Sequence, residues 1–122
     1  MTDPPRRFPA RLFASGQEPD PRFSLANERT FLAWISTSLA LIAAGVALEA
    51  LGLGLNSALR IAASVLLIAA GIATPVQAWL GWYRAEQSLR QGRPLPSPFL
   101  AAPLAGVVVA AGVLVCLAVL VP

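Results

Sequence analysis

The chain has 122 residues, of which 57% are hydrophobic and only 12% are charged, and its mean hydropathy is +0.68. Soluble domains carry roughly a quarter of their residues as Asp, Glu, Lys or Arg, so this composition excludes an ordinary water-soluble protein. All nine basic residues are arginine, histidine is absent and Cys116 is the single cysteine, which excludes a zinc cluster, a Cys–His pair and an internal disulfide within one chain.

The N-terminal part of the chain is polar and rich in arginine and proline. Residues 1–19 hold four prolines, a composition typical of a disordered tail. A secretory signal peptide has its apolar core close to the start, whereas the first long apolar run here begins near Phe31. We therefore predict a disordered tail over residues 1–19 and one membrane domain over residues 20–122.

Three uncharged apolar runs follow, from Phe31 to Leu48, from Ile61 to Trp82 and from Phe99 to Val121. Each is long enough for a helix that crosses a bilayer core, which takes roughly 20 residues. Backbone amides in lipid must be hydrogen-bonded within their own segment, and the runs lack the alternation of a barrel strand. The predicted fold class is all-α: an integral membrane protein with three transmembrane helices, over about residues 31–52, 60–82 and 99–121.

Helix-capping residues stand before each run, in the pairs Asp20-Pro21, Asn56-Ser57 and Ser97-Pro98. Pro75 and Pro103 each remove a backbone donor inside a predicted helix, so each predicts a bend unless a neighbour compensates or the third helix begins late. Gln77 is expected either to satisfy the carbonyl that Pro75 leaves free or to face another helix. The hydroxyls of residues 36–38 are expected to bond to carbonyls of their own helix.

The arginines are distributed unequally along the chain. Eight of the nine lie before the first predicted span or between the second and third, and only Arg60 lies in the other connection, where Glu49 is its expected partner. This bias predicts a cytoplasmic N-terminus and an external C-terminus, with the inverted topology as the alternative. Aromatic residues gather at membrane interfaces, and the predicted interface anchors are Trp34, Trp79, Trp82 and Tyr83.

The segment that enters the first span carries the densest charge. Arg22, Arg29 and Ser36 recur every seven residues, so on a continuous helix they share one stripe. One interpretation is that the arginines bind anionic lipid headgroups. The other is an anion site in which guanidinium groups from several helices bind a phosphate-like group. The candidate anion or ion-pair cluster comprises Arg22, Asn27, Glu28, Arg29, Arg84 and Glu86.

Other features bear on assembly and on the class of function. Glu86 and Arg90, four residues apart, predict an exposed ion pair at a solvated helix end. Small residues that permit close helix approach lie on two faces, one with Ala33, Ala40 and Ala44 and one with Ala102, Gly106 and Ala110. These faces leave open whether they meet within one chain or between chains. We expect self-association, because three helices alone bury little and enclose no polar path.

Several functional classes are disfavoured. No carboxylate lies at mid-membrane in a predicted span, which counts against a proton relay. No nucleophile–base pair, metal-ligand set or phosphate loop is present, so neither an enzyme nor a cofactor is expected. Nucleic-acid binding is not expected despite a pI of about 10.5, because the arginines flank the spans.

The segment RFSLANERTFLAWI, residues 22–35, resembles the YidH-like bacterial inner-membrane proteins, the family named domain of unknown function 202. The likeness continues through Thr37, Leu39 and Gly45 and more loosely through Trp82, Glu86 and the turn at residues 94–96. It implies a three-helix protein of the bacterial cytoplasmic membrane of mostly unassigned activity. It also implies a relationship to the membrane domain of the vacuolar transporter chaperone, which makes and translocates polyphosphate.

The residues that match this relative are Asn27, Glu28, Arg29 and Trp34, which lie there at the cytoplasmic mouth of an oligomeric channel. Family members commonly have arginine where this chain has Ser36, and that departure counts against a basic pore lining. Two hypotheses follow. The first is a non-enzymatic homo-oligomer with an anion-contacting or pore-mouth cluster. The second is a small interaction subunit that stabilises another membrane complex. Expected partners are anionic membrane lipids, further copies of the chain, and another membrane subunit in the second case.

Overall fold

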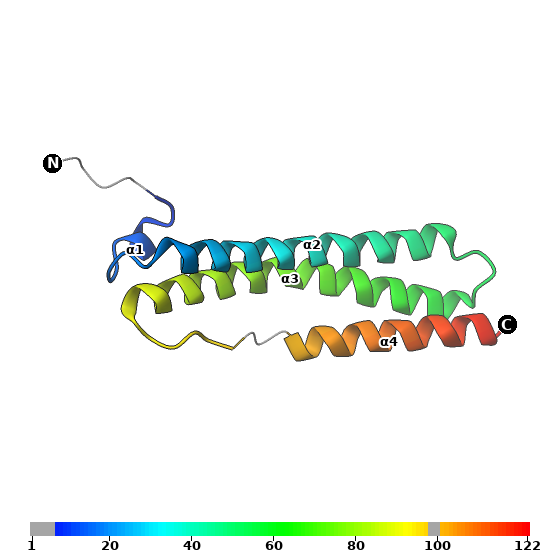
Figure 1. Ribbon diagram of the computed structural model, residues 1–122. Coiled ribbons are helices and arrows are strands. Elements are labelled where there is room, and N and C mark those ends of the chain that lie inside the picture. Colours follow the sequence, from blue (N-terminus) through cyan, green and yellow to red (C-terminus); the bar gives the residue numbers. More distant parts are fainter. Residues whose placement is uncertain (1–6, 98–100) are drawn as a thin grey trace.

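The computed structural model describes residues 7–97 and 101–122 (Figure 1). Its helices are α1 (Ala10–Phe13), α2 (Pro21–Leu51), α3 (Ser57–Gln91) and α4 (Ala101–Leu120). By length and composition α2, α3 and α4 are able to cross a membrane. The predicted all-α fold with three spans is confirmed, whereas the predicted start of the third span at residue 99 lies outside the described residues.

The three long helices lie side by side, with α3 between α2 and α4 (Figure 1). In the described part of the chain, α3 contacts both neighbours, and α2 and α4 make no close contact with each other. The helices therefore form an open layer and not a closed bundle. The described helices of one chain enclose no path between them, and one side of α2 and one side of α4 stay exposed.

Helices α2 and α3 are longer than a bilayer core is thick. With 31 and 35 residues they extend about 46 and 52 Å, against roughly 30 Å of hydrocarbon. Both pass beyond the predicted spans at the same end, where α2 begins and α3 finishes. We call this end, formed by residues 7–34 and 77–97, the arginine end.

Both helices start at the capping residues that the sequence predicts. The Asp20 carboxylate accepts a hydrogen bond of 2.9 Å from the Arg22 amide, and Pro21 follows as the first helical residue. Asn56 Oδ1 accepts from the Leu59 amide at 3.1 Å. The predicted cap at Ser97-Pro98 extends outside the described residues. Pro103 lies in the first turn of α4, where a backbone donor has no partner to lose.

Close approach of α2 and α3 depends on two glycines. A Cβ atom on Gly71 would lie 2.5 Å from Cγ1 of Ile42, and one on Gly45 would lie 2.6 Å from Cγ1 of Ile68. Neither position tolerates a side chain without a shift of its neighbour. The small-residue face predicted from Ala33, Ala40 and Ala44 is exposed, so it does not form this contact.

The polar side chains near the middle of α2 follow two patterns. Thr37 donates to the Ala33 carbonyl at 3.0 Å, the predicted bond within its own helix. Ser38 instead donates to the Gly71 carbonyl of α3. That carbonyl lies four residues before Pro75 and lacks its usual backbone donor. Ser38, and not Gln77, therefore compensates for the proline.

At the end opposite the arginine end, polar contacts hold the connection between α2 and α3 in place. Arg60 pairs with Glu49 at 3.4 Å, which confirms the predicted partner. The backbone amide of Asn56 donates to the Ala118 carbonyl at 3.1 Å and so connects this turn to α4.

Candidate functional site

The N-terminal segment packs against the arginine end. Leu12 of α1 is only 1% exposed, and the Gln17 amide donates to the Arg90 carbonyl at 3.0 Å. The structure here differs from the predicted disordered tail over residues 7–19, while residues 1–6 lie outside the described chain. The segment is ordered because Leu12 and Phe13 form an apolar pair that packs on the last turns of α3.

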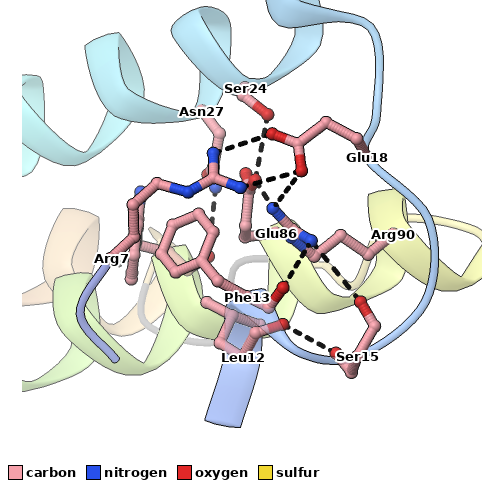
Figure 2. Close-up of polar contacts among 10 residues, drawn as sticks. Arg7, Leu12, Phe13, Ser15, Glu18, Ser24, Asn27, Glu86 and Arg90 are labelled. Carbon is pink, nitrogen blue, oxygen red and sulfur yellow. Dashed lines mark hydrogen bonds and ion pairs between the residues drawn. The ribbon is translucent and has the colours of Figure 1, made fainter. Parts of the chain in front are cut away.

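Arg90 is the centre of a polar network under this segment (Figure 2). Although 4% exposed, it donates to the Phe13 carbonyl at 3.1 Å and to Glu18 at 3.0 Å, and its guanidinium lies 4.6 Å from the centroid of the Phe13 ring. Arg7 contacts the other side of the network through two hydrogen bonds of 2.7 and 2.8 Å to Glu18. Two guanidinium groups thus share one carboxylate.

Glu86 lies beneath Arg90 and is 3% exposed. Its carboxylate accepts a 2.9 Å hydrogen bond from the Ser24 hydroxyl of α2 and lies 3.8 Å from Nε of Arg90. The sequence predicts this pair as solvated. It is buried because the N-terminal segment covers the end of α3, and a buried charge needs such partners. Glu86 therefore joins α2 and α3 through a polar contact.

The Glu18 carboxylate responds electrostatically to this arrangement. The hydrogen bond from Arg7 is the largest cause that lowers its pKa, to about 2, and the hydrogen bond from Arg90 adds to the effect. Glu18 is therefore ionised throughout the physiological pH range and holds residues 7–18 against α3.

Aromatic rings pack between α2 and α3 at the same end. Trp79 and Trp82 stack with centroids 5.2 Å apart, and the Phe31 ring lies 6.5 Å from each of them. Asn27 adds a hydrogen bond of 3.0 Å from its amide to the Trp82 carbonyl. The predicted interface anchors Trp79 and Trp82 thus also pack against α2 and α1, and Tyr83 is partly exposed beside them.

A groove of about 380 Å³ runs between α2 and α3 beside these rings. Its walls are mainly apolar and include Phe31, Trp34 and Trp82, and the segment at residues 95–97 closes one side. Arg84 and Gln77 are among its polar lining residues. A second, polar hollow of about 370 Å³ adjoins it, lined by Arg84, Gln87, Ser88, Arg93, Pro94 and Pro96.

The remaining charged residues of the predicted cluster lie on a different surface. Arg22, Glu28 and Arg29 are all exposed. At 100° per residue, Arg22 and Arg29 lie roughly 130–150° around α2 from the side that faces α3. The structure thus divides the predicted cluster into three parts: Arg22, Glu28 and Arg29 outside, Arg84 at the groove, and Asn27 and Glu86 between the helices.

Comparison with known proteins identifies the part of the chain that matches a family. A family model described as domain of unknown function 202 (DUF202) matches residues 22–88, which span nearly all of α2 and most of α3. The chain belongs to the DUF202 family. The match covers the contact between α2 and α3, including Asn27, Gln77 and Glu86, and the groove lining up to residue 85, while the lining residues from 89 to 97 lie beyond it.

Two kinds of relative show the breadth of the family. An uncharacterised protein of Mycobacterium tuberculosis, Rv2272, is 44% identical over 84 residues, which cover 68% of this chain and 69% of that protein. Inner membrane protein YidH of Escherichia coli is 37% identical over 84 residues, which cover 66% and 71%. No solved structure matches the chain significantly. The predicted YidH-like resemblance is confirmed, and the protein is a small multi-pass protein of the inner membrane.

Parts of the site are not apparent from sequence patterns. The contact of Glu18 with Arg90 joins residues 72 positions apart, and Glu18 lies in a segment with the composition of a tail. The one available signal is the adjacent pair Leu12-Phe13, two apolar residues within a polar stretch. The groove follows from side-chain shapes on two helices, which no spacing rule supplies.

Proposed function

We propose that the protein is a non-enzymatic homo-oligomer that contacts anions of the phosphate class at the arginine end. The observation that carries the proposal is the position of Arg29, exposed on the side of α2 that faces away from α3. An arginine there is available to another copy and to solutes, and guanidinium binds phosphate oxygens in pairs of hydrogen bonds.

A continuous surface on α2 supports this assembly. We call it the outer face, and its exposed members are Arg22, Arg29, Ala33, Ser36, Ala40 and Ala44. On a helix of 100° per residue they lie within about 40° of one line. Leu25, Leu32 and Leu39 form a separate exposed line on α2 that suits contact with lipid. Small side chains permit the close helix approach that stabilises association in membranes.

Association through the outer face would bring several copies of Arg29 together. Like charges that approach in a partly apolar surrounding need counter-charges, which favours bound anions. Arg22 already pairs with Asp20 at 2.9 Å, so Arg29 provides most of the charge. Ser36 continues the outer face into the membrane without a charge. The proposed anion contact is therefore restricted to the level of Arg29, at the arginine end.

We further propose that the arginine end faces the cytoplasm. Eight of the nine arginines belong to this end or to the segments that flank it, and Arg60 lies at the other. Excess arginine in short flanking segments retains them on the cytoplasmic side. The resemblance to the membrane domain of a complex that translocates polyphosphate agrees with a cytoplasmic arginine end, because the matching residues of that domain lie at its cytoplasmic mouth. It also suggests polyphosphate as the first anion to test.

Flux of phosphate and of short polyphosphate into liposomes tests the proposal, with purified wild type, Arg29→Ala and a protein-free control. Arg11→Ala is the matched variant, because Arg11 is also exposed at this end but lies off the outer face. We expect flux or anion binding in wild type and Arg11→Ala and a clear loss in Arg29→Ala. Flux at the protein-free rate together with absence of anion binding in the wild type would overturn the proposal.

A second candidate function rests on α4. Ala102, Gly106 and Ala110 are exposed, and apart from the neighbouring backbone of α4 itself no described atom lies within 4 Å of the position of a Cβ on Gly106. This face points away from Ala111 and Ala118, which are buried against the layer. It supports an interaction subunit that packs on another membrane protein. Loss of a stoichiometric co-purifying partner in Gly106→Leu, with retention in Arg29→Ala, would favour this function over the first.

A further inference from the structure

The groove and the polar hollow at the arginine end are neighbouring parts of one surface. Arg84 and Pro96 line both. The hollow adds Arg93, so two arginines line it together with the polar residues Gln87 and Ser88. The groove adds rings and alkyl groups from α2 and α3. A polar, cationic compartment thus continues into an apolar one.

Gln77 places in the apolar compartment an amide oxygen to which no described group of the protein donates a hydrogen bond. It is 4% exposed, it lines the groove, and within the described residues its Oε1 atom has no hydrogen-bond partner. The carbonyl left free by Pro75 is satisfied by Ser38, so compensation for the proline does not explain Gln77. A buried amide oxygen without a donor is costly, and a ligand that brings a donor to it, directly or through the water that hydrates the ligand, removes that cost.

We infer that these two compartments form a binding site for an anionic phospholipid. The phosphate lies in the hollow against Arg84 and Arg93. The glycerol ester region lies beside Trp82, where Gln77 Nε2 donates to an ester oxygen and Gln77 Oε1 accepts from the water that hydrates the esters. One acyl chain continues from there along Phe31 and Trp34.

Position in the membrane selects a lipid over a soluble anion. Arg84 and Gln77 are seven residues apart on α3, about 10 Å along the axis and on the same side of the helix. Trp82 lies between them, at the boundary where the uncharged run of α3 ends. The charged compartment is therefore at headgroup level and the apolar compartment at acyl-chain level. A free phosphate ion would occupy the hollow and leave the groove and Gln77 without a function.

Tryptophan quenching by lipids with brominated acyl chains measures occupancy of the groove. The Trp79→Phe background leaves Trp34 and Trp82, both of which line it. The full chain is reconstituted in phosphatidylcholine vesicles with a small fraction of brominated phosphatidylglycerol or brominated phosphatidylcholine. We expect about fivefold stronger apparent binding of the anionic lipid, the attraction of one arginine to the net negative charge that phosphatidylcholine lacks.

Three variants separate this site from general charge attraction. Arg84→Gln should abolish the preference for the anionic lipid. Arg29→Gln removes a charge at the same end but outside the site and should retain the preference. Gln77→Leu should weaken quenching by the anionic lipid while leaving the lipid-free protein in detergent equally or more resistant to unfolding, because it removes a buried amide oxygen that has no donor. A purely structural glutamine would give the opposite change in resistance.

Four outcomes would overturn the inference. Two concern the preference for the anionic lipid: equal quenching by the two brominated lipids in wild type, or equal loss of the preference in Arg84→Gln and Arg29→Gln. The third is a destabilised Gln77→Leu with unchanged lipid binding. The fourth is displacement of the anionic lipid by millimolar inorganic phosphate, which would indicate a free-anion site. None of these results depends on flux through the protein, so the site fails or stands independently of the proposed function.

Discussion

The hydroxyl of Ser38 in α2 donates a hydrogen bond to the carbonyl oxygen of Gly71 in α3. Pro75 has no N–H to offer that carbonyl, and in a membrane no water replaces it. Gly71 also permits the approach, because a Cβ there would lie 2.5 Å from Cγ1 of Ile42 and 2.9 Å from the Ser38 carbonyl oxygen. One contact therefore stabilises a proline within α3 and fixes α2 against it.

Ser38→Ala should lower the free energy of unfolding by about 1 kcal/mol, the usual size of a hydrogen bond between membrane helices. Unfolding of the purified protein in mixed detergent micelles measures the change. Ser36→Ala, at an exposed position two residues away, should have little effect. In a Pro75→Ala background the effect of Ser38→Ala should nearly vanish, since residue 75 then supplies the missing donor. An undiminished effect would contradict the assigned partner.

Gly71→Ala should destabilise the contact between α2 and α3 by about 1–3 kcal/mol, as overpacking does in a closely packed interior. Gly112→Ala is the matched control, because apart from the neighbouring backbone of α4 itself no described atom lies within 4 Å of a Cβ at that position. Alanine is the better helix former, so the control should be neutral or slightly stabilising. Thermal unfolding in detergent distinguishes them, and equal melting temperatures would disprove the close approach.

Arg90→Ala should release the N-terminal segment and destabilise the arginine end by about 3 kcal/mol, because it leaves the buried Glu86 carboxylate without its cation. Arg90→Lys should restore little, since one ammonium group does not reproduce the contacts to Phe13 and Glu18. Arg93→Ala, on the exposed side, should change stability by less than about 0.5 kcal/mol. Amide hydrogen exchange of residues 12–17 reports the release, and protection that survives Arg90→Ala would count against the network.

Acid should detach the N-terminal segment. The pKa of Glu18 falls from an ordinary 4.5 to about 2 in the folded chain, mainly through Arg7 of the same segment and further through Arg90 of α3, so the contribution of these contacts is fully present above pH 4.5 and is lost as the pH falls towards 2. A spin label on the exposed Ala14 should be restrained at pH 6 and become mobile between pH 4.5 and 2. Glu18→Gln should remove that transition, and an unchanged transition in this variant would assign it to another group.

The fold follows from the sequence to a large extent, because single residues carry strong local information. Uncharged runs of about 20 residues specify spans, and Asp20 and Asn56 each supply a side-chain acceptor that starts a helix. The Glu49–Arg60 pair follows from its position at the ends of a short connection. These features depend on neighbours in the chain, which a sequence displays directly.

The candidate site follows less well, because its geometry depends on which sides of α2 and α3 meet. Glu28 and Arg29 are neighbours of Asn27 in sequence, yet Asn27 contacts α3 and the other two are exposed. Burial of Glu86 depends on docking of a segment whose composition indicates disorder. Packing of Gly45 and Gly71 selects the contact side of α2, and the alanines that a spacing rule favours lie elsewhere.

Cysteine cross-linking along α2 tests most directly whether the outer face joins copies of the protein. Single cysteines at positions 32–47, introduced in a Cys116→Ser chain, are oxidised in native membranes. We predict dimer yields with maxima at Ala33, Ser36, Ala40 and Ala44 and minima at Leu32, Leu39 and Val46, the period of one helix face. Maxima at the leucine positions, or yields without helical period, would contradict an assembly that brings Arg29 of several copies together.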